Sequence, residues 1–123
     1  MNRQNSQDRR RSQRIETRLP LNIAFDGYDL TTFTWNVSCT GAYCHINKYI
    51  PPFTKIAVRM NLPLNGGQAD SAENGVECRG VVVRSVDEER GGFNIAIFFN
   101  EINENHKRKI NRYVSKSLPA SSS

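Results

Sequence analysis

The 123-residue sequence lacks any apolar run long enough to cross a membrane. A membrane-spanning helix needs roughly 20 consecutive, mostly apolar residues. The N-terminus is rich in arginine, but no apolar segment follows it, so the pattern of a secretory signal peptide is missing as well. We therefore expect no membrane insertion and a cytoplasmic location. The three cysteines, an odd number without a paired framework, agree with such a reducing compartment.

Side chains that carry catalysis or hold metals are also scarce. His45 and His106 are the only histidines, and the residue spacing supports neither a Ser/His/Asp triad nor a pair of catalytic carboxylates. Cys39, Cys44 and Cys78 form no C-x-x-C pair, so a place in the core is the simpler interpretation. The sequence predicts that the protein is not an enzyme and holds no metal or cofactor.

Lysine is absent from the basic N-terminal segment. Six of the first eighteen residues are arginines, and with Asp8 and Glu16 they contribute +4 of the net charge of +5. Arginine offers a planar fork of donors that can bind a phosphate or a guanine edge through two hydrogen bonds. Residues 1–14 are therefore predicted to form a recognition arm. Almost nothing in this arm is apolar, so we expect it to be flexible until something binds it.

The following part of the chain has the alternating apolar pattern of β-strands. Leu21, Ile23 and Phe25 alternate with other residues, and the turn signal Asp26-Gly27 comes next. The pattern predicts six strands, at residues 20–25, 28–36, 42–46, 55–62, 76–86 and 93–100. So many strands in so short a segment leave little room for crossover helices. The predicted fold class is all-β, a six-stranded antiparallel sheet that closes into a small barrel.

The spacing of apolar residues changes near Asn103, where a helix is predicted. One stripe at steps of three and four consists of Ile102, His106, Ile110, Tyr113 and Val114. The simplest role for this helix is to plug one mouth of the barrel. We expect one domain over residues 15–116, with residues 117–123 as a disordered tail.

Two short motifs are the strongest functional signal. Arg10-x-x-x-Arg14 lies in the arm, and Asn36-x-Ser38-x-x-Gly41 lies at the turn after the second predicted strand. Either motif alone would be weak, because arginine-rich arms and turns with Asn, Ser and Gly are common. Their order and spacing together make a specific pattern.

This pair of motifs resembles those of the PilZ domain, RxxxR followed by [D/N]xSxxG. The resemblance extends from Arg9 to Val114 and includes the strand sequence of residues 79–84, the pair Phe98-Phe99 and the closing helix. The PilZ domain is a bacterial receptor module for the second messenger cyclic di-GMP. The resemblance therefore implies a PilZ-like split barrel and a cyclic di-GMP receptor.

The chemistry of cyclic di-GMP suits the residues of both motifs. Its guanine O6/N7 edges and its phosphates suit the guanidinium forks of Arg10 and Arg14. Asn36 can offer an amide and Ser38 a hydroxyl, while Gly41 is expected to adopt a positive φ and let the backbone come close to the ligand.

Some residues depart from the family pattern or lie beside it. Asn36 stands where aspartate is common, and its neutral carbonyl should pair more weakly with a guanine. Ala96 stands where the family commonly has glycine, a small change to local packing. Arg9 could stack on a second, intercalated cyclic di-GMP, which favours two ligands per site. Arg3 and Arg18 are most simply solvated charges.

Two alternatives to the receptor remain open. A nucleic-acid-binding barrel could use the basic arm and stack bases on Tyr28, Phe33 and Trp35. Against it, residues 19–100 carry six basic and eight acidic side chains, whereas tracking a phosphate backbone needs a basic stripe. A PilZ-like interaction module that binds no nucleotide is the other alternative, but such domains typically lose one motif and both motifs are present here.

The arm suggests how a signal could leave the domain. Ligand binding is expected to draw the arm across the barrel near Asn36 and Ser38 and so change the exposed surface. With no catalytic segment in the sequence, the output must pass to a downstream protein, which the sequence does not identify.

Overall fold

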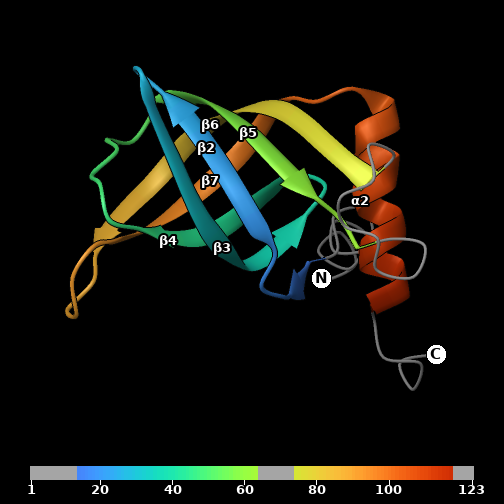
Figure 1. The fold of residues 1–123 in the computed structure, drawn as a ribbon, viewed down its shortest axis with the longest axis horizontal. Coiled ribbons are helices and arrows are strands. Elements are labelled where there is room, and N and C mark those ends of the chain that lie inside the picture. Colours follow the sequence, from blue (N-terminus) through green and yellow to red (C-terminus); the bar gives the residue numbers. More distant parts are fainter. Residues whose placement is uncertain (1–13, 64–73, 118–123) are drawn as a thin grey trace, which may run out of the picture.

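Seven antiparallel strands and one helix make up the part of the chain that the structure describes (Figure 1). The structure is a computed structural model, and it describes residues 14–63 and 74–117. The elements in chain order are β1 (Ile15–Glu16), β2 (Pro20–Phe25), β3 (Tyr28–Ser38), β4 (Gly41–Ile46), β5 (Lys55–Asn61), β6 (Gly75–Asp87), β7 (Phe93–Glu101) and α2 (Glu104–Ser117). The predicted all-β fold with a C-terminal helix is confirmed.

Strand β3 closes the sheet into a barrel. Six strands follow the order β3-β2-β5-β6-β7-β4, and β4 pairs back with β3. The first part of β3, from Tyr28 to Phe33, pairs with β2, and the second part, from Thr34 to Ser38, pairs with β4. Because β3 serves both neighbours, the six strands form a closed ring, and the predicted six-stranded antiparallel barrel is confirmed.

The seventh strand, β1, was not predicted from the sequence. Its two residues, Ile15 and Glu16, pair with Val37 and Asn36 on β3. Two residues are too few to show the alternation that marks a strand. The pairing is important because it fixes the chain directly after Arg14 beside the second motif.

Alternate residues of each strand fill the barrel. In β5, Ile56, Val58 and Met60 are buried, while Ala57 and Arg59 between them are exposed. Other buried strand residues are Leu21, Ile23, Val37, Val82, Ile95 and Ile97. Burying a large aliphatic side chain contributes roughly 1.5–3 kcal/mol, so this interior is the main source of stability and leaves the outer wall for function.

Helix α2 covers one end of the barrel, as Figure 1 shows. Ile110, Tyr113 and Val114 form its buried face, and the helix packs against β3 and β6. The Tyr113 hydroxyl lies 3.0 Å from the Thr17 hydroxyl, just after β1. The helix therefore closes this end, as predicted, and it runs to Ser117, the first residue of the predicted tail.

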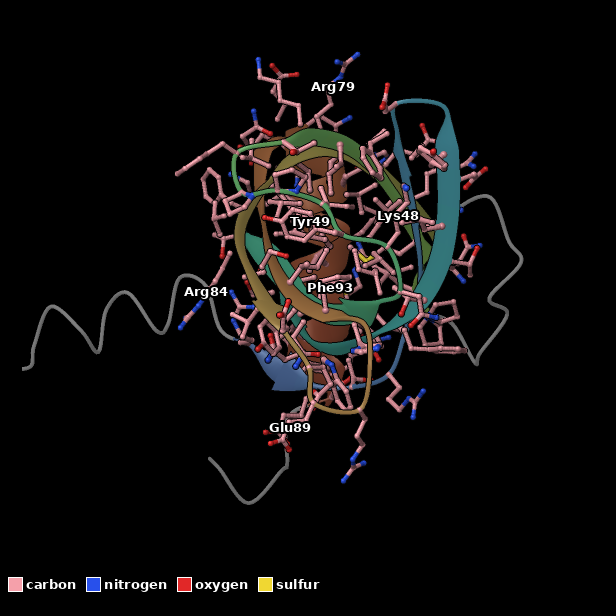
Figure 2. All side chains as sticks on the ribbon, turned by 90° about the vertical axis from the view of Figure 1, so that its left-hand side faces the viewer. Lys48, Tyr49, Arg79, Arg84, Glu89 and Phe93 are labelled. Carbon is pink, nitrogen blue, oxygen red and sulfur yellow. The ribbon has the colours of Figure 1, made fainter. Side chains whose placement is uncertain are left out.

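The opposite end of the barrel is covered by the loop between β4 and β5. Ile50 of this loop is fully buried, and the Tyr49 and Phe93 rings lie 5.2 Å apart between centroids. Figure 2 looks at this end, where both rings lie over the barrel opening. With both ends covered, a ligand site on the described part of the protein is expected on the outer wall.

Part of the predicted organisation lies outside the described residues. Most of the arm, residues 1–13, and residues 118–123 of the tail are in this group. Within residues 14–63 and 74–117, no helix is long and apolar enough to cross a membrane.

Truncating Ile110 tests the packing of the helix on the barrel. Ile110→Ala is expected to lower the free energy of unfolding by about 2–5 kcal/mol, because the fully buried side chain leaves a cavity. Urea denaturation followed by circular dichroism measures the change. Arg112→Ala, at an exposed position of the same helix, should stay within about 0.5 kcal/mol of the wild type. Equal stability of the two variants would contradict the packing described above.

Candidate functional site

The two motifs meet at the junction of β1 and β3. Arg14 Nη1 donates a hydrogen bond of 2.7 Å to Asn36 Oδ1, across 22 residues of sequence. The pairing of Ile15 with Val37 and of Glu16 with Asn36 holds Arg14 at this place. The last residue of RxxxR and the first residue of NxSxxG therefore form one polar contact.

A β-bulge in β3 sets the orientation of Asn36. The register between β3 and β4 shifts between Thr34 and Asn36, where Trp35 is the extra residue. Thr34 and Val37 are buried, while Trp35 is half exposed and Asn36 is partly exposed. The Thr17 N–H donates to the Trp35 carbonyl at 3.1 Å, so the chain after β1 supports the bulge. Two consecutive side chains thus reach the outer wall instead of one.

Arg14 keeps a charge that a ligand could use. Partial burial lowers the pKa of Arg14, but a guanidinium stays protonated in proteins. The amide of Asn36 is neutral, so their hydrogen bond orients the guanidinium without cancelling its charge. This contact gives the outer wall an oriented cation beside an amide, which is suitable for an anionic nucleotide.

Ser38 builds the turn between β3 and β4. Its side chain is fully buried, and its Oγ accepts a hydrogen bond of 3.1 Å from the Thr40 N–H. The hydroxyls of Ser38 and Thr40 are 2.9 Å apart. The Thr40 carbonyl in turn accepts from the Phe99 N–H at 2.9 Å, which ties the turn to β7. Direct binding of a ligand by Ser38 stays a prediction.

Gly41 has a different structural role from the one expected. The expected positive φ is wrong: among the described glycines, Gly27, Gly91 and Gly92 have positive φ and Gly41 does not. Gly41 instead lies at the start of β4, where a Cβ would be 2.1 Å from the Ile97 carbonyl oxygen. Glycine is needed here because β7 passes too close for any side chain, and the turn keeps its position as a result.

The remaining predicted site residues, Arg9 and Arg10, lie outside the described residues. The structure therefore brings Arg14, Asn36 and the turn of Ser38 together, and it leaves the roles of the other two arginines as predictions.

Strand register adds neighbours that the sequence did not reveal. Asn36 pairs with Tyr43, Tyr43 with Ala96, and Ala96 with Arg84. This row crosses four strands on the outer wall and ends at the exposed Arg84, which points away from the barrel in Figure 2. Sequence alone could not find Arg84, because the row depends on pairing between strands far apart in the chain.

Cys44 and Cys78 are held in the fold by burial, and His45 by a contact with Asn94. Burial raises the pKa of the Cys44 and Cys78 thiols to about 12, so both stay protonated at neutral pH. His45 Nδ1 lies 3.1 Å from Asn94 Oδ1. In the described part of the chain, no group of three or more His, Cys, Asp or Glu side chains is placed to hold a metal ion.

A large cavity in the described part of the chain lies away from both motifs. It has a volume of about 780 Å³ and is lined by β2, β5, β6 and the end of β7, with Arg59 and Arg79 at its sides. Its lining includes neither Arg14 nor Asn36, so the volume of this cavity does not point to the place where the two motifs meet.

The fold and the motif junction together define a small helix-capped β-barrel with its motifs joined on the outer wall. A family model for the PilZ domain matches residues 8–116. The chain belongs to the PilZ domain family, and the resemblance inferred from the two motifs is confirmed. A search of curated proteins finds no match.

Solved structures share this fold at low sequence identity. The Bacillus subtilis inhibitor of motility (MotI/DgrA) has a TM-score of 0.75 and 16% identity; the match covers 88% of this chain and 50% of that one. The PilZ domain of YcgR from Escherichia coli, solved with cyclic di-GMP, has a TM-score of 0.60 and 13% identity, with 88% and 90% covered. The PilZ domain of CeSA from a cellulose-synthesizing bacterium has a TM-score of 0.58 and 20% identity, with 85% and 97% covered. This chain thus spans half the length of MotI.

Replacing Ser38 tests its part in building the turn. Ser38→Ala is expected to lower the free energy of unfolding by about 1–3 kcal/mol, because the partly buried Thr40 N–H loses its acceptor. Urea denaturation measures this loss. Thr31→Ala, at an exposed position of the same strand, is the control and should change stability by less than about 0.5 kcal/mol. Unchanged stability of Ser38→Ala would show that the turn does not need the hydroxyl.

Proposed function

We propose that this protein is a receptor for cyclic di-GMP. The hydrogen bond between Arg14 and Asn36 is the observation that carries the proposal, because it joins two motifs that are far apart in the sequence. Membership of the PilZ family supports it, as does the YcgR PilZ domain of the same fold, which was solved with cyclic di-GMP. The domain would act as a binding module and not as an enzyme.

Each motif has its own task in this proposal. The guanidinium groups of Arg10 and Arg14 bind the phosphates and the guanine O6/N7 edges. Asn36 contributes its amide beside Arg14, while Ser38 and Gly41 hold the turn that keeps Asn36 in position. Arg9 stacks on a second, intercalated ligand, which gives two cyclic di-GMP molecules per site.

Signalling follows from the place of the arm. Arg14 is already fixed to the outer wall, so a ligand bound there can draw residues 1–13 across the same wall. The surface offered to another protein then differs between the free and bound states, and a partner that prefers one state senses the ligand. The downstream target is a protein with such a preference.

Calorimetric titration with cyclic di-GMP tests the receptor. Saturable binding at micromolar concentrations is expected, and the stoichiometry distinguishes one ligand from two. Arg14→Ala should weaken binding by roughly 10- to 150-fold, the effect of losing a charged hydrogen bond. Arg9→Ala should halve the stoichiometry, and the exposed Arg90→Ala is the matched control that should bind normally.

An absence of binding heat at tens of micromolar ligand would refute the receptor. Tight binding of single-stranded oligonucleotides instead would favour a nucleic-acid-binding barrel.

Changing Asn36 to aspartate tests its part in the site. Asn36→Asp is expected to tighten cyclic di-GMP binding by about 5-fold, since a carboxylate accepts more strongly than an amide carbonyl from the guanine N1 and N2 donors. Asn36→Ala should weaken binding, and both affinities are measured by calorimetry. If aspartate weakens binding as much as alanine does, then the amide donors of Asn36 are what the ligand needs.

A further inference from the structure

We infer that a cleft between Phe33 and Trp35 binds one guanine base of cyclic di-GMP by stacking. This inference rests on the proposed function and adds a base-binding subsite that neither motif contains. It lies on β3, immediately before Asn36.

Phe33 and Trp35 are two residues apart on one strand, and the regular spacing of such positions suits a planar base. Phe33 is 46% and Trp35 50% exposed, whereas Thr34 between them is buried, so both rings are on the outer wall. Residues two apart in a strand are roughly 6.6 Å apart along it. A flat ring between two others needs about 3.5 Å on each side, the usual contact distance of carbon atoms. One base can therefore fit between the rings.

The structure contains a cleft at this position. It has a volume of about 190 Å³ and is lined by Arg18, Thr32, Phe33, Thr34, Trp35 and His45. This is the volume of about six water molecules, enough for one base and too small for a whole dinucleotide. A single base is thus the part of the ligand that fits.

Hydrogen bonds hold the floor of the cleft in place. The Thr34 Oγ1 accepts from the Leu19 N–H at 2.9 Å and donates to the Thr17 carbonyl. The Thr34 N–H donates to the Leu19 carbonyl at 2.9 Å. On the other side, the Thr32 hydroxyl donates to the His45 carbonyl. Because the backbone is fixed on both sides, the cleft is present before a ligand arrives and binding requires little reordering.

Arg18 makes the cleft suited to guanine. Its guanidinium lies over the face of the Phe33 ring, with Cζ 5.0 Å from the ring centroid, and Arg18 lines the cleft. From there its donor fork can reach the O6 and N7 acceptors of a base stacked on Trp35. Arg18 is exposed, as expected of a solvated charge, and it also contacts the Phe33 ring.

The cleft lies next to the motif junction along the chain. Trp35 directly precedes Asn36, and Thr17, which bonds the Trp35 carbonyl, is three residues after Arg14 in the chain. A dinucleotide with a phosphate at Arg14 can therefore place a base beside Trp35. An apolar ligand would gain nothing from the two arginines, so a base of an anionic nucleotide is the occupant that fits.

Trp35 is the only tryptophan of the chain, so its fluorescence reports this cleft directly. Titrating the wild-type protein with cyclic di-GMP is expected to quench the emission with the midpoint found by calorimetry. Trp35→Ala should bind roughly 5- to 150-fold more weakly, the range found for stacking of a base on an aromatic side chain. Phe33→Ala should show a loss in the same range. Tyr28→Ala, an exposed aromatic at the other end of β3, is the control and should bind normally.

The possible outcomes distinguish failure of the base-binding cleft from failure of the proposed receptor function. Calorimetric binding with unchanged Trp35 emission and normal affinity of Trp35→Ala would overturn the cleft and leave the receptor in place. An absence of calorimetric binding would overturn both. Quenching by a single-stranded oligonucleotide but not by cyclic di-GMP would assign the cleft to nucleic acid, and it would also overturn the inference. The wild-type titration needs no variant, so a folding defect in Trp35→Ala cannot obscure the result.

Discussion

The double pairing of β3 is the constraint on which the rest of the structure depends. One half of this strand bonds to β2 and the other half to β4, and this closes the barrel. The change of partner coincides with the bulge at Trp35, where β1 also joins the strand. Barrel closure, the exposure of Asn36 and the docking of Arg14 therefore have the same origin, and a loss of the bulge would disturb all three.

Local patterns allowed most of the fold to be predicted, and long-range packing explains the rest. The alternation of Ile56, Val58 and Met60 marks β5 because the period of a strand is visible in any half-buried segment. β1 was missed because its stability comes from β3 and not from its own two residues. The importance of Gly41 was foreseen but its reason was not, because the constraint is the Ile97 carbonyl on β7.

The candidate site, too, could be predicted from local sequence only in part. The motifs pointed to Arg14 and Asn36, which the structure brings into contact, and their spacing was enough to indicate the family. The motifs could not show that Ser38 is fully buried, nor that Arg18 lies against Phe33. Both depend on how the chain around β1 crosses β3, which no local pattern records. With α2 and Ile50 covering the barrel ends, binding chemistry is left to the outer wall.

The hydrogen bond between Thr17 and Tyr113 has a consequence for communication within the domain. Thr17 directly follows β1, and Arg14 directly precedes the same strand. Thr17 bonds both the bulge of β3 and the helix α2. Only three residues of backbone therefore separate Arg14 from the contact with the Tyr113 hydroxyl. The short segment from Arg14 to Thr17 thus contacts both the wall where the nucleotide would bind and the helix that covers the end of the barrel.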